Sequence, residues 1–256
     1  MNSQVLRRNV DLLFLLTKKD TSIRYKNSVF GYLWAICNPL CFAFIYYIVF
    51  KVVMKVQIEN YTVFLLSALF AWQWASNSII NNLNVYSSNT QIIKKTVFPK
   101  YFLLLSNILM ETIHFIITIP VIILFLFIYN IQLSTEWFYG VPLLLISQII
   151  LIFSISLLFS SLNVFFRDIE RIVQLSMMVL FYLTPVLYNI DMVPSEYSSL
   201  VLFNPFTYQI LNWRSLFLYG DFNLLYMIYS LSYSALILFI AVVVYNKVKY
   251  KFAEVL

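Results

Sequence analysis

Charged residues are scarce in this sequence: they make up 11% of its 256 residues, whereas 62% of the residues are hydrophobic. A soluble domain carries roughly a quarter charged residues, so this composition excludes an ordinary soluble domain and indicates a membrane protein. Long apolar runs that cross a bilayer must satisfy their own backbone hydrogen bonds, and helices do so. Membrane β-barrels would show short alternating segments instead. We therefore predict an all-α membrane protein.

Glycine, histidine and cysteine are also rare, and their absence excludes several kinds of site. Three scattered glycines, Gly31, Gly140 and Gly220, cannot form a GxxxxGK phosphate-binding loop or a GxGxxG dinucleotide motif. One histidine excludes HExxH, and two cysteines exclude a four-cysteine zinc site. No paired-acid motif indicates a metal-dependent glycosyltransferase. We expect no catalytic residue, no bound metal or cofactor, and no ATP hydrolysis by a phosphate loop of this chain.

Charge-free runs divide the chain, which we treat as one transmembrane domain of residues 1–256, into six predicted spans. Crossing the hydrocarbon core takes about 20 apolar residues. The expected spans are about 29–50, 61–83, 101–129, 138–166, 172–190 and 223–246.

The lysines and arginines predict the orientation of these spans. Fourteen of the 17 lie in the N-terminal segment, in the connections after the second and fourth spans, and in the C-terminal tail. Only Lys51, Lys55 and Arg214 lie on the other face. By the positive-inside rule both termini are expected in the cytoplasm. Topology thus accounts for the net charge of +6, and we expect membrane lipid but no nucleic acid as a partner.

The N-terminal segment, residues 1–28, has helical spacing. Leu6, Val10 and Leu13 share one face, and the basic residues lie elsewhere. This pattern predicts an amphipathic helix in the cytoplasmic interface. The alternative is a solvated basic arm that only marks topology.

The stretch between the last two spans is too interrupted to cross the membrane. Pro194 and Pro205 divide it into short pieces rich in aromatic residues. We expect short re-entrant or interfacial helices on the outer face. An ordinary amphipathic lid is the alternative.

Two ionisable residues lie inside the third span. Glu111 and His114 are three positions apart and therefore share a helix face. Ionisable groups within the membrane often serve a proton pathway, which is one interpretation. A hydrogen-bonded pair that fixes contacts between helices is the other, favoured because no further acid lies deep enough to continue a relay.

The end of the second span, SNSIINNLNVYSSNTQ (76–91), is rich in amides and hydroxyls. Such groups are costly against lipid, so they should line a cavity, contact a helix or leave the membrane. With Trp72, Trp74 and Tyr86, this region has the chemistry of a carbohydrate path. An aromatic belt at the membrane interface explains the two tryptophans almost as well.

Several motifs, in order along nearly the whole chain, resemble one family. RYKNSVFGYLWAICNPL (24–40), IIKKTVFPK (92–100), NVFFRDIERIVQL (163–175), LTPVLY (183–188) and NPFTYQILNWR (204–214) are similar to the corresponding segments of type-2 ABC exporter permeases. The likeness is to those permeases that export O-antigen, capsule or teichoic-acid polymers.

The resemblance implies a half-transporter. Two copies of the chain would form a homodimer, and two copies of a separate ABC ATPase, carrying ATP and Mg²⁺, would bind beneath it. The connection at about residues 89–100 would be a coupling helix in a groove of the ATPase, and the connection near residues 167–171 would lie at the same face. Residues assigned to coupling in this way are Gln91, Lys94, Lys95, Val97, Phe98, Pro99, Lys100, Arg167, Asp168, Glu170 and Arg171.

Charge and shape suit these assignments. The lysines of the first connection would pair with acids of the ATPase, and Val97, Phe98 and Pro99 would provide an apolar contact. If the lysines are only topology markers, this apolar triplet is unexplained. In the second connection, Arg167 with Glu170 and Asp168 with Arg171 are spaced as i, i+3 ion pairs of a helix.

The resemblance also implies a substrate, a polysaccharide on a polyprenyl pyrophosphate, and a location in the bacterial cytoplasmic (inner) membrane. Arg24 and Lys26 would meet the pyrophosphate or, alternatively, anionic lipid headgroups. A long polymer needs a continuous channel, which we expect at the homodimer axis. The predicted substrate path comprises Arg24, Lys26, Tyr46, Trp72, Trp74, Asn81, Tyr86, Tyr182 and Tyr188. The alternative function is an ATP-independent secondary transporter or lipid flippase that uses Glu111 and His114.

Overall fold

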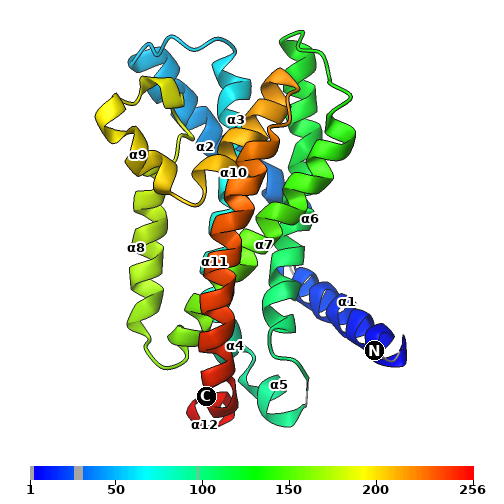
Figure 1. Cartoon of the computed structure of the whole chain (residues 1–256). Coiled ribbons are helices and arrows are strands. Elements are labelled where there is room, and N and C mark those ends of the chain that lie inside the picture. The colour runs from blue at the N-terminus through cyan, green and yellow to red at the C-terminus, as the bar shows by residue number, and fades with distance from the viewer. Residues whose placement is uncertain (1–2, 26–30, 97) are drawn as a thin grey trace.

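The structure, a computed structural model, describes residues 3–25, 31–96 and 98–256. Two predicted site residues, Lys26 and Val97, lie outside these ranges. Within them every regular element is a helix, as predicted (Figure 1).

Five helices of the described chain are long and apolar enough to cross a membrane. The longest are α3 (Tyr61–Leu83), α6 (Phe102–Ile128), α7 (Trp137–Asn163) and α11 (Leu224–Val248). The fifth combines α2 (Trp34–Tyr46) with a π-helical turn, η2 (Tyr47–Val53). The predicted range 61–83 coincides with the bounds of α3, and three other predicted ranges differ from the helices by one to three residues at their ends.

The first predicted span, 29–50, stops at the charge of Lys51, which is too early. The helix continues to Val53. The ammonium group of Lys51 donates to the carbonyl of Ile58, 3.0 Å away, in the loop that follows. A long basic side chain can thus lie in the last turn of a span and reach a polar partner beyond it.

The predicted fifth span, 172–190, is wrong at both ends. Helix α8 runs from Asp168 to Leu183, so the charged residues form its first turn, and the corner before it is shorter than predicted. The helix stops because Thr184 is extended before Pro185. Its 16 residues span about 24 Å, less than a hydrocarbon core of about 30 Å.

Helix α3 is the centre of the bundle. Of its span 78% is buried, against 17% for α11, and it contacts α2, α6, α7, α8 and α10. We call the end of the bundle that carries α5 and α12 the α5 end, and the opposite end the α9 end (Figure 1). Helix α1 (Ser3–Tyr25) slants away at the α5 end and packs on α6.

Short helices occupy both ends. At the α9 end are η3 (Ile190–Met192), α9 (Ser195–Phe203), α10 (Thr207–Arg214) and the π-helical η4 (Ser215–Tyr219). At the α5 end are α4 (Val85–Ser88), α5 (Thr90–Lys95), η5 (Lys249–Lys251) and α12 (Phe252–Val255); η1 (Gly31–Leu33) leads into α2. Helix α10 is buried from Gln209 to Arg214, and its assignment as a re-entrant or interfacial helix stays a prediction.

Candidate coupling surface and substrate path

Helix α5 presents a polar face at the α5 end of the bundle. Gln91, Lys94 and Lys95 are exposed, whereas Ile93 is buried in an apolar cluster that includes Phe252. The backbone amides of Ile92 and Ile93 donate to the carbonyl of Asn89, at 3.0 and 3.1 Å, and so begin the helix. The short helix is thus anchored through one buried apolar side chain, with its basic side chains outward.

The segment after α5 packs on the C-terminus of the same chain. Phe98 packs against the cluster around Ile93, and Pro99 is half-buried. Lys100 donates to the carbonyl of Lys249 at 2.9 Å and lies 5.2 Å from the ring centroid of Phe252. Burial lowers the pKa of Lys100. Lys100 is therefore engaged within its own chain, and Lys94 and Lys95 are the exposed lysines of this connection.

The second predicted coupling segment begins α8. Arg167, Asp168 and Arg171 are exposed and Glu170 is half-buried. The expected i, i+3 ion pairs are absent. Neither Arg167 nor Arg171 forms an ion pair with an acid of the described chain. Instead the amide of Glu170 donates to Asn163 Oδ1 at 3.0 Å. The two acids lie in the first turn of α8, where the helix dipole stabilises negative charge.

Three predicted path residues lie in the interior of one chain. Trp72 is 5.3 Å, centroid to centroid, from Phe206, and Trp74 stacks on Phe115 at 4.8 Å. Tyr86 is fully buried against Phe252. These rings are thus packed between helices of a single copy. Their assignment to a path stays a prediction.

Other path residues lie close together on α2 and α8. The ring of Tyr46 is 5.6 Å from that of Phe181, which is 5.1 Å from Tyr182. The side chain of Tyr182 is 59% exposed. Tyr188, in the turn after α8, donates to the carbonyl of Leu183 at 3.2 Å. The structure therefore brings Tyr46 and Tyr182 together in one aromatic row.

Glu111 is not isolated inside the bundle. It accepts a hydrogen bond from the guanidinium of Arg24 on α1, and a second, 2.9 Å long, from the amide of Asn81 on α3. His114 Nδ1 lies 3.4 Å from the carboxylate and 3.4 Å from Arg24. The network joins α1, α3 and α6. It favours the interpretation of Glu111 and His114 as fixing helix contacts.

Sequence reasoning did not find the Arg24–Glu111 pair. The signal was present, because a carboxylate in an apolar span needs a cationic or hydrogen-bonding partner. The partner lies 87 positions away, and nothing in the local pattern identifies it. The predicted contact of Arg24 with pyrophosphate stays a prediction.

Arg214 is buried in the bundle, whereas the sequence marks it only as a positive charge on the outer face. It lies at the end of α10 with its guanidinium carbon 3.7 Å from the ring centroid of Phe64. Its guanidinium donates to the carbonyls of Val186, at 2.9 Å, and Tyr188, at 3.4 Å. Tyr61 donates to the carbonyl between them, that of Leu187, at 3.2 Å. Two side chains thus hold the turn that follows α8.

Comparison with known proteins places the chain in a family. Residues 11–218 match the family of ABC-2 type transporters. The chain is 50% identical to an O-antigen export system permease protein RfbA of Klebsiella pneumoniae over 96% of its length and 95% of the relative. Another such protein of this species is 49% identical over the same shares, and one of Myxococcus xanthus is 26% identical over 80% of each chain. The sequence motifs, the all-helical bundle and these matches agree: the chain belongs to the family of ABC-2 type transporters.

Proposed function

We propose that this chain is the membrane permease subunit of an ATP-driven exporter of O-antigen linked to polyprenyl pyrophosphate. The observation that carries the proposal is the 50% identity with an O-antigen export system permease protein. This identity extends over almost the whole of both chains. The chain contains no phosphate loop, which agrees with ATP and Mg²⁺ being held by a separate ATPase.

The proposed assembly is a homodimer with two ATPase subunits at its α5 end. The exposed face of α5, with Gln91, Lys94 and Lys95, supports docking there because its charges suit an acidic groove. Arg167 and Arg171 at the start of α8 would extend the same surface. This orientation puts both termini in the cytoplasm and the protein in the bacterial inner membrane.

The proposed topology has six spans. Helix α8 would cross most of the membrane, and the buried turn Thr184–Leu187 would complete the crossing. Irregular backbone is tolerated at membrane depth where it is buried in protein. We place the polymer path at the homodimer axis along the aromatic row of α2 and α8, which includes Tyr46 and Tyr182.

The proposal is tested by complementation of a strain that lacks its own O-antigen permease. Co-expression of the chain with its partner ABC ATPase should restore surface O-antigen on immunoblots, whereas the chain without that ATPase should restore none. The Glu111→Gln variant should not abolish export. Export that needs no ATPase, is blocked by uncouplers and is lost in Glu111→Gln would favour the secondary transporter instead.

The coupling surface has its own test. Alanine at Arg167 and Arg171 together should leave insertion intact, because these exposed side chains form no ion pair within the described chain. It should lower export per ATP hydrolysed, because both residues lie on the proposed docking surface. The control is Lys247→Ala, which removes an exposed positive charge from α11. Normal export by the Arg167 and Arg171 variant would reduce these residues to topology markers.

A further inference from the structure

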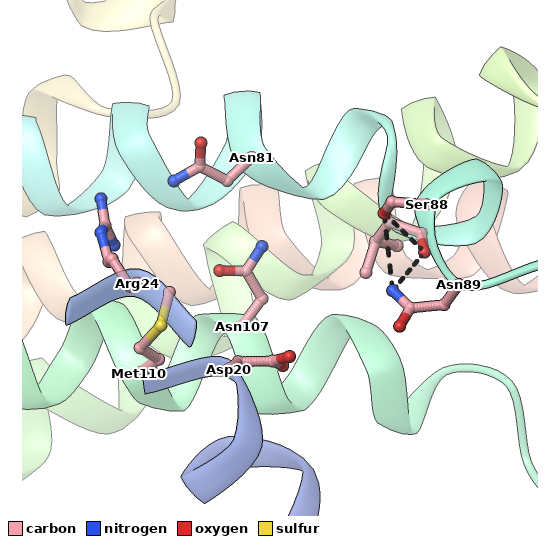
Figure 2. Close-up of a pocket in the computed structure, with 8 residues that line it drawn as sticks. Asp20, Arg24, Asn81, Ser88, Asn89, Asn107 and Met110 are labelled. Atoms are coloured by element: carbon pink, nitrogen blue, oxygen red, sulfur yellow. Dashed lines mark hydrogen bonds between the residues drawn. The ribbon is translucent and has the colours of Figure 1, made fainter. Parts of the chain in front are cut away.

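A polar cavity lies between α1, α6 and the end of α3. Its volume is about 290 Å³. Six of its eight lining residues are polar, and Figure 2 shows them on three sides of the space: Asp20, Arg24, Asn81, Ser88, Asn89 and Asn107. Polar groups gathered around one space call for a polar occupant.

The charges of the cavity are already compensated. Arg24 is paired with Glu111, and Asp20 lies 3.0 Å from the ammonium of Lys19. Asp20 also accepts a hydrogen bond of 2.9 Å from the hydroxyl of Ser106. Because each charge has a partner beside the cavity, the site has no uncompensated cation to select a phosphate. It therefore favours a neutral ligand.

The amide of Asn107 is the group that lacks a partner. Its Oδ1 is buried and accepts no hydrogen bond from the described residues, whereas the residue as a whole is half-buried. In Figure 2 this amide points from α6 into the space between α1 and α3. A buried amide oxygen without a hydrogen bond costs free energy, and a hydroxyl donor from a ligand offsets that cost. Asn81 donates to Glu111 through Nδ2, and its Oδ1 remains available as a further acceptor.

These groups match vicinal hydroxyls. A hydroxyl both donates and accepts, as the amide of Asn107 does, while the oxygens of Asp20 and Asn81 only accept. The volume of about 290 Å³ lies at the lower end of the roughly 300–1,000 Å³ of small-molecule sites, so it suits one ring and not an oligosaccharide.

We propose that this cavity binds a single neutral polyhydroxyl group. Two sources share that chemistry, a sugar ring of the exported glycan and the glycerol headgroup of a membrane lipid; the first of them rests on the proposed function. The cavity also touches the coupling element, because Asn89 both lines it and begins α5. A bound ring therefore bridges α1 and the start of α5.

The test uses the whole complex with its ATPase, reconstituted in nanodiscs. Saturation-transfer NMR with N-acetylglucosamine, galactose and mannose measures sugar binding. Native mass spectrometry after mild delipidation measures retention of phosphatidylglycerol against phosphatidic acid, which carries a negative phosphate but no glycerol headgroup. The variant is Asn107→Leu, which keeps the branched side-chain shape, replaces both polar atoms with methyl groups and removes no described hydrogen bond. The control is Asn246→Leu, an exposed asparagine of α11 away from the cavity.

Loss of two hydrogen bonds should weaken binding about tenfold. Sugar binding that falls in Asn107→Leu but not in the control supports the glycan as the source. Preferential retention of phosphatidylglycerol that falls in the same way supports the lipid. Binding of neither probe, or binding that Asn107→Leu leaves unchanged, overturns the proposal and leaves the cavity to water. Complementation by the unmodified chain is scored separately, so failure of the cavity and failure of the export function are distinguishable.

Discussion

Arg24 and Arg214 enter the helix bundle from α1 and α10, and the protein satisfies the two cations differently. Arg24 meets a carboxylate, Glu111, that is 3% exposed. Arg214, itself 3% exposed, meets two backbone carbonyls and the face of Phe64. Among the ion pairs of the described chain none includes Arg214.

The difference indicates what each contact depends on. The Arg24 contact depends on charge, because removing one partner leaves the other as an unpaired ion in the bundle. The Arg214 contact depends on shape, because a planar guanidinium can donate to two acceptors and stack on a ring at once. Stability should therefore depend on the charges of Arg24 and Glu111 at the first site. At the second site it should depend on the guanidinium of Arg214, which a lysine cannot replace.

The largest effect is expected for Arg24→Ala, which leaves Glu111 with Asn81 and His114 beside it but without the guanidinium of Arg24. We expect a loss toward the lower end of the roughly 3–5 kcal/mol of a broken buried pair, because the Arg24 side chain is 37% exposed. The measurement is the apparent melting temperature of the purified protein in detergent. Adding Glu111→Gln should recover much of the loss. A double variant no more stable than Arg24→Ala would show that charge does not hold α1.

The sequence predicted the long elements well for physical reasons. Helix α3 begins after Asn60, whose φ of 47° is left-handed, and both its apolar run and its polar end are visible in the sequence. For α8 the rule that charges end a span failed. Asp168 and Glu170 are inside the helix because its N-terminus favours acids.

The site was harder to predict because both faces of these helices are apolar. Periodicity separates buried from exposed positions in water, but a residue facing lipid is as apolar as one facing protein. Trp72 and Trp74 therefore looked like path or belt residues, and the structure buries them. Contacts between distant elements, such as Arg24 with Glu111, leave no periodic signal.

The second-largest effect is expected when arginine is replaced by lysine at each of the two sites in turn. Arg214→Lys should lower stability by about 1–3 kcal/mol, because an ammonium cannot reproduce two carbonyl contacts together with stacking on Phe64. Arg24→Lys should cost less, since a point charge can still pair with a carboxylate. Parallel melting curves of the two variants measure the difference. A larger loss for Arg24→Lys would reverse our assignment of charge to one site and shape to the other.

A smaller effect is expected for Asn81→Ala, which removes one hydrogen bond to Glu111. The expected cost is about 1 kcal/mol. Because Asn81 and Arg24 share the same carboxylate, the combined variant should deviate from additivity. Asn77→Ala, an exposed position one turn earlier on α3, should add independently to Arg24→Ala. If the effects of Asn81→Ala and Arg24→Ala also add, Arg24, Asn81 and Glu111 do not act as one network.

The smallest effect is expected for Lys19→Ala, which tests whether the Lys19–Asp20 pair helps to hold α1 on the bundle. The Lys19–Asp20 pair is 3.0 Å long, but its side chains are 35% and 23% exposed, and Lys19 also donates to Asn89 at 3.1 Å. Solvent screening limits such a pair to less than about 1 kcal/mol. Lys19→Ala should therefore lower the melting temperature only slightly at low salt, and the difference from the unmodified protein should shrink as salt is added. A loss as large as that of Arg24→Ala, and unchanged by salt, would place the main attachment of α1 at Lys19 and not at the buried carboxylate of α6.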